Sequence, residues 1–221
     1  MTQVNKKAII FDLDGVIVDT AKYHYLAWRK IANDLGFDFS EAQNESLKGV
    51  SRVQSLDYLL KAGSIQLSEK EKNKLLKEKN EHYLSLISHM NEGELLDGIA
   101  ELLRQLNLNK IPFALGSASK NARMILDALH LTSVFTAIVD GNDVTKAKPD
   151  PEVFLIAAQR LGINPKNCIV VEDSQAGIQA ANKVDMISIG IGEKNVLFEA
   201  KFLLPDTSQL TFEFFNKIIN Q

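Results

Sequence analysis

The chain has 221 residues and is 45% hydrophobic, which predicts a globular protein with one large domain, or one domain that carries an insertion. Its 25 basic and 28 acidic residues leave a net charge of -3, so no basic surplus indicates nucleic acid or an anionic membrane as a partner. Cys168 is the only cysteine, which excludes an internal disulfide, and no apolar stretch is long enough to span a bilayer; we expect a cytoplasmic protein without signal peptide or membrane anchor.

Short apolar runs that alternate with helix-like segments predict a parallel α/β sheet. The runs cover residues 8–11, 113–115, 137–139, 168–171 and 186–191. Apolar residues recur at helical spacing over residues 99–106, 125–129 and 153–161. Small residues between 176 and 181 share one face of a further helix and would let it approach the sheet closely.

A long helical segment separates the first two apolar runs. It is about ninety residues long, far beyond an ordinary crossover connection, and it shows helical patterns over residues 24–35, 56–60 and 68–88. We expect an inserted helical domain over residues 19–91, with the core formed by residues 1–18 and 92–221. The charge run at residues 69–79 is interpreted as a solvated helix face.

Asp12-Leu13-Asp14-Gly15 follows the first apolar run directly. A turn at Gly15 allows the carboxylates of Asp12 and Asp14 to converge above the end of the strand. A hard divalent cation would remove their mutual repulsion by accepting carboxylate and carbonyl oxygens. In the alternative interpretation the two acids only hold a turn or cap the next helix. The pattern favours phosphate chemistry at this end of the sheet.

The other polar clusters also follow predicted strands, and ligand sites of open α/β sheets lie at that edge. They are Ser117-Ala118-Ser119-Lys120-Asn121, Lys148 and Glu172-Asp173. Ser117 and Lys148 are a donor and a cation suited to the oxygens of a transferring phosphoryl group. The alternatives are an exposed loop lysine at 148, and helix caps at Ser119, at Asn121 and at the acidic pair.

This order of motifs resembles the haloacid dehalogenase-like (HAD) superfamily. The shared features are the Asp-x-Asp-Gly start, a Ser after the second strand, a Lys ahead of the fourth and the acidic pair. Further segments resemble the β-phosphoglucomutase family within it: Asp19-Thr20, His24, Trp28, and Lys48-Gly49-Val50-Ser51-Arg52 with Ser55. The resemblance implies a Rossmann-like parallel sheet with an inserted α-helical cap.

The resemblance also implies an activity. It is that of a phosphomutase which interconverts β-D-glucose 1-phosphate and D-glucose 6-phosphate through a phosphorylated Asp12 and β-glucose 1,6-bisphosphate. Asp14 would be the general acid and base. Mg²⁺ would be bound by Asp12, Asp173 and the backbone carbonyl of Asp14, with Glu172 acting directly or through a bound water. The alternatives are a Mg²⁺-dependent sugar-phosphate phosphatase and a catalytically silent sugar-phosphate-binding protein.

The remaining site residues are assigned by the same resemblance. The second phosphate of the bisphosphate would lie at Arg52, Ser119, Lys120 and Asn121, with Ala118 and Ser55 also at the substrate. Lys48-Gly49 would close with His24 over the sugar, and Thr20 would lie at the hinge of the cap. Trp28 would form a wall of the sugar pocket. His24 and Trp28 are alternatively packed core residues. We expect small-molecule sugar phosphates as partners, no nucleic acid or membrane, and a monomer.

Overall fold

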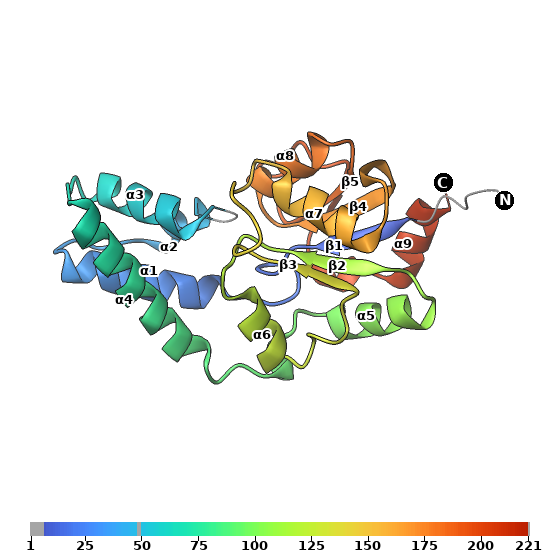
Figure 1. Ribbon diagram of the computed structural model, residues 1–221, viewed down its shortest axis with the longest axis horizontal. Helices are drawn as coiled ribbons and strands as arrows, with labels where there is room; N and C mark the ends of the chain where they lie inside the picture. The colour runs from blue at the N-terminus through green and yellow to red at the C-terminus, as the bar shows by residue number, and fades with distance from the viewer. Residues whose placement is uncertain (1–6, 48–49, 221) are drawn as a thin grey trace.

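The structure is a computed structural model that describes residues 7–47 and 50–220. Its strands are β1 (Ala8–Phe11), β2 (Phe113–Gly116), β3 (Ala137–Val139), β4 (Cys168–Glu172), β5 (Ile187–Ile191) and β6 (Phe202–Leu204). Within the described residues they form one parallel sheet in the order β3-β2-β1-β4-β5-β6 (Figure 1). The predicted parallel α/β sheet is confirmed, and β6 is an additional edge strand that the apolar runs did not reveal.

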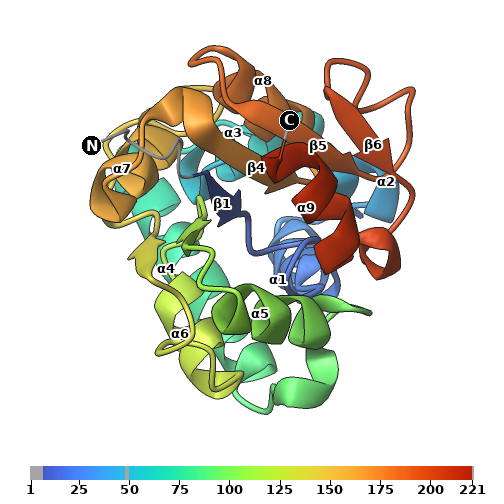
Figure 2. The same ribbon diagram turned by 90° about the vertical axis from the view of Figure 1, so that its right-hand side faces the viewer.

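Helices cover both faces of the sheet. They are α5 (Ile99–Leu108), α6 (Ala122–Ala128), α7 (Glu152–Leu161), α8 (Gln175–Asn182) and α9 (Phe212–Ile219), with short 3-10 helices η1 (Glu92–Glu94), η2 (Pro165–Asn167) and η3 (Thr207–Gln209). Figure 1 shows α7 and α8 above the sheet and α5 and α6 below it, and the turned view in Figure 2 agrees. The alternation of side chains along a strand produces this arrangement. Ile9 and Phe11 of β1 pack with α5, α6 and α9, whereas Ala8 and Ile10 pack with α7 and α8.

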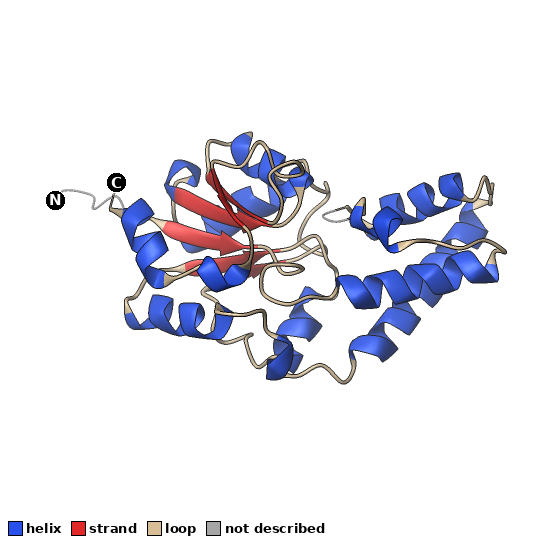
Figure 3. Cartoon of the chain, turned by 180° about the vertical axis from the view of Figure 1, so that it is seen from behind, coloured by secondary structure: helices blue, strands red, loops and turns tan. Residues whose placement is uncertain are grey.

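A group of helices follows β1 and lies beyond the carboxyl ends of the strands. These helices are α1 (Ala21–Asp34), α2 (Glu41–Glu45), α3 (Arg52–Ala62) and α4 (Glu69–Ile87). In Figure 3 they form the strand-free end of the molecule. Trp28, Ile31, Leu56 and Leu59 belong to an apolar cluster of their own, so this part has its own packing. Among the described residues no helix is long and apolar enough to cross a membrane.

Two segments connect the helical part to the sheet, and they are tied to each other. The amide of Leu96 donates to the carbonyl of Ile17 at 3.0 Å. Glu94 accepts a hydrogen bond from Lys22 at 2.9 Å and another from the hydroxyl of Tyr23 at 2.8 Å. The exit and the return of the chain therefore lie side by side. The domain boundaries at residues 18/19 and 91/92 stay a prediction, and Lys48 and Gly49 lie outside the described residues.

Candidate active site

The chain turns sharply after β1, which brings Asp12 and Asp14 to the same cavity. Gly15 has a φ of +73°, in the left-handed region that favours glycine. A Cβ at this position would lie 2.1 Å from Oδ2 of Asp173, so any other residue would have to displace that carboxylate. Glycine therefore allows the loop after β1 to approach the residues that follow β4.

Lys148 joins the ends of β1 and β4. Its Nζ lies 2.6 Å from Oδ1 of Asp12 and 2.6 Å from Oε1 of Glu172, and it donates to the carbonyl of Gly116 at 3.1 Å. Burial by itself lowers the pKa of a lysine, but the two carboxylates outweigh it and hold the pKa of Lys148 above its ordinary value. Lys148 is 2% exposed, so the alternative of an exposed loop lysine is wrong.

The two acids after β1 both hold protons more tightly than ordinary aspartates. Burial raises the pKa of Asp12 to about 6, although the ammonium of Lys148 opposes the shift. Burial and the negative charge of Asp12 together raise the pKa of Asp14 to about 8. Oδ1 of Asp14 is enclosed and has no hydrogen-bond partner among the described residues. In the absence of a cation, Asp14 is therefore mostly protonated at neutral pH, the state that a general acid requires.

An acidic group at the ends of β1 and β4 could hold a metal ion. Asp12, Glu172 and Asp173 each contribute one carboxylate oxygen, and these atoms lie within 4.8 Å of one another. Oxygen ligands of this kind suit a hard cation such as Mg²⁺. Both oxygens of Glu172 are already hydrogen-bonded, Oε1 to Lys148 and Oε2 to the amide and hydroxyl of Ser174. Glu172 is thus suited to orienting Lys148.

The segment after β4 also decides how Glu172 is buried. The N-cap of α8 is Ser174, whose Oγ accepts from the amide of Gly177 at 3.1 Å, so the alternative of the acidic pair as a helix cap is wrong. A Cβ at Gly177 would lie 2.0 Å from Cδ of Glu172. Gly177 therefore makes room for the carboxylate that holds Lys148. The sequence indicated only that small residues on this helix allow close packing.

The loop after β2 is held in place by its own serines. Ser117 donates its amide to the carbonyl of Val139 at 3.0 Å, and its Oγ accepts from the amide of Ser119 at 3.1 Å. The hydroxyl of Ser119 in turn accepts from the amide of Asn121 at 3.2 Å. Asn121 occupies the N-cap position of α6, but its side chain makes no cap hydrogen bond. The capping alternative is therefore wrong for Asn121, whose side-chain Nδ2 donates instead to Oδ1 of Asn80 at 2.9 Å.

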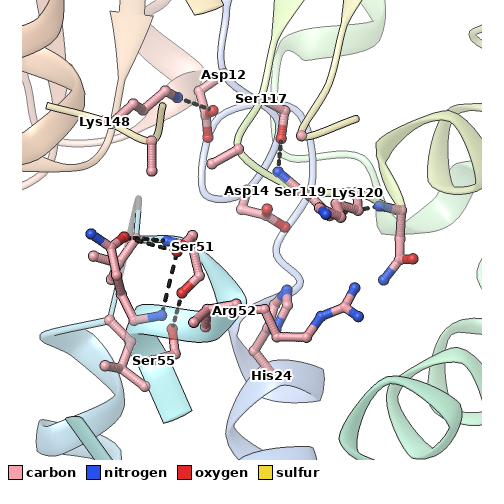
Figure 4. Close-up of a pocket in the computed structure, with 18 of the residues that line it drawn as sticks. Asp12, Asp14, His24, Ser51, Arg52, Ser55, Ser117, Ser119, Lys120 and Lys148 are labelled. Atoms are coloured by element: carbon pink, nitrogen blue, oxygen red, sulfur yellow. Dashed lines mark hydrogen bonds and ion pairs between the residues drawn. The ribbon is translucent and has the colours of Figure 1, made fainter. Parts of the chain in front are cut away.

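The cavity has a volume of about 550 Å³ and is lined from both parts of the molecule. In Figure 4, His24, Ser51, Arg52 and Ser55 lie across the cavity from Asp12, Ser117, Ser119, Lys120 and Lys148. Ser51 caps α3 and exchanges hydrogen bonds with Gln54, which fixes the start of the helix where Arg52 is the first residue. The helix terminus thus presents Arg52 to the core.

Most of the residues expected at the site line this cavity. The lining residues are Asp12, Asp14, Asp173, Ser117, Ala118, Ser119, Lys120, Asn121, Lys148, Arg52, Ser55, His24 and Trp28. Glu172 reaches the site through Lys148. Thr20 is fully buried at the start of α1, where its carbonyl accepts from the amide of His24 at 3.0 Å. Lys48 and Gly49 fall outside the described residues, so their role stays a prediction.

Lys79 is a lining residue that sequence reasoning missed. Its Nζ lies 2.7 Å from Nδ1 of His24 and 4.8 Å and 4.7 Å from the ring centres of Trp28 and Tyr83. The side chain is 1% exposed, so the interpretation of residues 69–79 as a solvated face is wrong at this position. Burial lowers the pKa of Lys79 well below its ordinary value, and the charge of Arg52 lowers it further. The sequence signal was the helical spacing of Lys79 and Tyr83.

The chain is similar to known proteins in both sequence and structure. A model of the haloacid dehalogenase-like hydrolase family matches residues 6–185. The chain is 43% identical over 209 residues to β-phosphoglucomutase of Bacillus subtilis, covering 94% of this chain and 92% of that protein. It is 30% identical over 200 residues to a phosphorylated carbohydrates phosphatase of Thermotoga maritima, covering 90% of each. The crystal structure of β-phosphoglucomutase from Clostridium difficile matches with a TM-score of 0.93 and 45% identity over 97% of each chain. The chain therefore belongs to the haloacid dehalogenase-like hydrolase family.

Proposed function

We propose that this protein is a phosphomutase that interconverts β-D-glucose 1-phosphate and D-glucose 6-phosphate through β-glucose 1,6-bisphosphate. The observation that supports this best is a cavity lined by anion-binding side chains both from the sheet part and from the helical part of the molecule. Lys148 and Ser117 lie at the Asp12 end, and Arg52 of the helical part shares the cavity with Lys120. A bisphosphate needs cations for both of its phosphates, whereas hydrolysis of a monophosphate needs only the first set.

Asp12 is the proposed nucleophile. A carboxylate oxygen of Asp12 forms a bond to phosphorus while the bond from phosphorus to the sugar oxygen breaks. Nζ of Lys148 lies 2.6 Å from Oδ1 of Asp12. Lys148 therefore holds the carboxylate in place and supplies positive charge near the phosphoryl group. With the bisphosphate in the site, this step breaks the bond to the C1 oxygen and leaves D-glucose 6-phosphate. In the second half of the cycle the C6 hydroxyl of β-D-glucose 1-phosphate attacks the phosphorylated Asp12, the bond from phosphorus to the aspartate oxygen breaks, and the bisphosphate forms again.

Asp14 is the proposed general acid and base. Its raised pKa of about 8 keeps the carboxyl group protonated at neutral pH, so it can donate a proton to the departing sugar oxygen. The resulting carboxylate takes a proton from the sugar hydroxyl that attacks the aspartyl-phosphate in the second half of the cycle. Asp14 therefore donates a proton in one half of the cycle and accepts a proton in the other half.

Mg²⁺ is the proposed cofactor. The groups that would hold it are the carboxylates of Asp12 and Asp173 and the backbone carbonyl of Asp14. One carboxylate oxygen of Asp12 and one of Asp173 lie within 4.8 Å of each other, which supports this assignment. When bound, the ion neutralises charge that develops on the phosphoryl oxygens. Glu172 is proposed to act through Lys148, because both of its carboxylate oxygens already accept hydrogen bonds.

Residues 19–91 are proposed to form a cap that closes over the sugar and excludes water, with a hinge at Thr20. An aspartyl-phosphate exposed to water hydrolyses, whereas in a closed site it can transfer its phosphoryl group to a sugar hydroxyl. His24 and Trp28 on the cap are proposed to contact the sugar, together with Lys79 and with Lys48-Gly49. A cytoplasmic location and a monomeric state stay predictions.

Phosphorus NMR tests this function. The purified protein is mixed with Mg²⁺, β-D-glucose 1-phosphate and a trace of β-glucose 1,6-bisphosphate, and we expect the signal of glucose 6-phosphate to grow. The Asp12→Asn variant should keep its melting temperature within a few degrees and lose at least about a thousandfold in turnover. Dominant release of free phosphate would favour a phosphatase, an activity that fits the name of the Thermotoga maritima relative. No change at all would favour a silent sugar-phosphate-binding protein.

A further inference from the structure

Asn121 makes a hydrogen bond that crosses from the sheet to the helical insertion. Its Nδ2 donates to Oδ1 of Asn80 at 2.9 Å, although 41 residues separate the two positions. Asn121 directly precedes α6, and Asn80 lies on α4 of the helical part. Both side chains are half-buried. The contact therefore joins the two parts at the loop where the second phosphate is proposed to bind.

The direction of this hydrogen bond matters at an anion site. The NH₂ group of an asparagine donates to phosphate oxygens, whereas its carbonyl oxygen repels them. Because Asn80 presents an acceptor, the amide of Asn121 turns its NH₂ group toward Asn80. One hydrogen of that group makes the contact, and the second stays available for another acceptor.

The two asparagines differ in their position relative to the cavity. Asn121 lines it, whereas Asn80 is not one of the described residues that do. The backbone of Asn121 is already fixed, since its amide donates to Oγ of Ser119 at 3.2 Å. Rotation of the side-chain amide is the freedom that remains, and this is the freedom that the contact with Asn80 removes. Asparagine is also a poorer helix former than alanine or lysine, so helix propensity does not explain an asparagine at position 80 of α4.

We propose that Asn80 is a positioning residue for the second phosphate of the bisphosphate, acting through the amide of Asn121. This inference rests on the proposed function, which assigns that phosphate to Arg52, Ser119, Lys120 and Asn121. The acceptor on α4 selects the amide orientation that presents a donor to the ligand. The same hydrogen bond links occupation of the second phosphate position to the placement of the helical part against the sheet.

The test compares single variants of the Mg²⁺-loaded enzyme in the mutase reaction. We expect Asn80→Ala to raise the KM for β-glucose 1,6-bisphosphate about five- to tenfold, because the amide of Asn121 would no longer be oriented to donate to the charged phosphate. The kcat should stay within about twofold. Asn73→Ala on the exposed face of the same helix is the matched control and should leave both constants unchanged. Melting temperatures of both variants establish that they are folded.

A double variant separates positioning from direct contact. If Asn80 acts through Asn121, Asn80→Ala combined with Asn121→Ala raises the KM no further than Asn121→Ala alone. A KM that rises additively in the double variant would overturn the positioning role. So would an unchanged KM in Asn80→Ala beside a raised KM in Asn121→Ala, and this result leaves the proposed function intact. Failure of the unaltered protein to form glucose 6-phosphate would overturn the proposed function and this inference together.

Discussion

The ammonium group of Lys148 lies 2.6 Å from Oδ1 of Asp12, and it makes a second contact of 2.6 Å with Glu172. One buried cation thus neutralises two carboxylates that approach it from neighbouring strands. The three groups depend on one another, because each would be a buried charge without its partners. This arrangement connects the stability of the fold with the chemistry proposed for Asp12.

Replacing Lys148 by methionine should damage both stability and turnover. Lys148→Met leaves Asp12 and Glu172 buried without a counter-charge, so we expect the free energy of unfolding to fall by about 3 kcal/mol. Turnover should fall at least about a hundredfold, because the variant lacks the cation near the phosphoryl group. Urea denaturation and the NMR assay measure the two effects. The control is Lys166→Met, whose side chain is 71% exposed; it should change stability by no more than about 0.5 kcal/mol.

Replacing Arg52 should separate the mutase reaction from simple hydrolysis. Arg52→Ala removes a cation proposed for the second phosphate, and we expect mutase turnover to fall about tenfold or more, with a smaller loss in hydrolysis of p-nitrophenyl phosphate. A small ester has no second phosphate to bind. Lys61→Ala, an exposed cation in the last turn of the same helix, is the matched control. Equal losses in both reactions would remove Arg52 from the second phosphate position.

The raised pKa of Asp14 predicts a pH dependence of stability. In the folded state its pKa is about 8, compared with an ordinary value of 3.8, so between these values the folded protein binds more protons than the unfolded chain. The contribution of Asp14 to stability therefore falls as the pH rises through this window.

Asp14→Asn removes the titrating group and tests this dependence. In metal-free buffer, we expect the stability of the variant relative to the parent to increase by about 3 to 4 kcal/mol between pH 5 and pH 8. Urea denaturation at both pH values measures the difference, and added Mg²⁺ should reduce it. A relative stability that stays constant with pH would show that Asp14 titrates normally.

Replacing Lys79 should stabilise the protein and impair the reaction. Burial and the charge of Arg52 lower the pKa of Lys79, so the protonated lysine opposes folding at neutral pH. Lys79→Met keeps the chain length against Trp28 and Tyr83, and we expect the free energy of unfolding to rise by about 1 kcal/mol.

The pH profile and a control variant check this explanation. Stability of the parent should rise as the pH approaches the ordinary lysine pKa of 10.5, and Lys79→Met should lack this rise. Turnover of the variant should fall because the contact with His24 is lost. Lys77→Met, with a side chain that is 78% exposed on the same helix, should alter neither property. A destabilised Lys79→Met variant would instead mean that the ammonium group is well compensated in the folded state.

The sheet was predictable to different extents along the chain. Strands β1 to β5 are nearly continuous apolar runs because helices bury them on both faces, and this is the pattern that the sequence shows. Strand β6 was missed because it has only three residues, all half-buried, at the edge of the sheet. Helix α9 was also missed, although Phe212, Phe215 and Ile219 repeat at helical spacing and could have indicated it.

The sequence by itself determined which acids, serines and lysine follow the strands, and therefore that Asp12, Ser117 and Asp173 meet at one edge of the sheet. Parallel strands place their carboxyl ends together, so order along the chain predicts proximity there. The tertiary structure alone decided that Lys79 is buried, that Asn80 reaches Asn121, and that Gly177 leaves space for Glu172. Those contacts depend on how whole helices are rotated and placed against the sheet. In a charged helix such as α4, each residue is rotated by about 100° from the one before it, so Lys77 faces water whereas Lys79 faces the cavity.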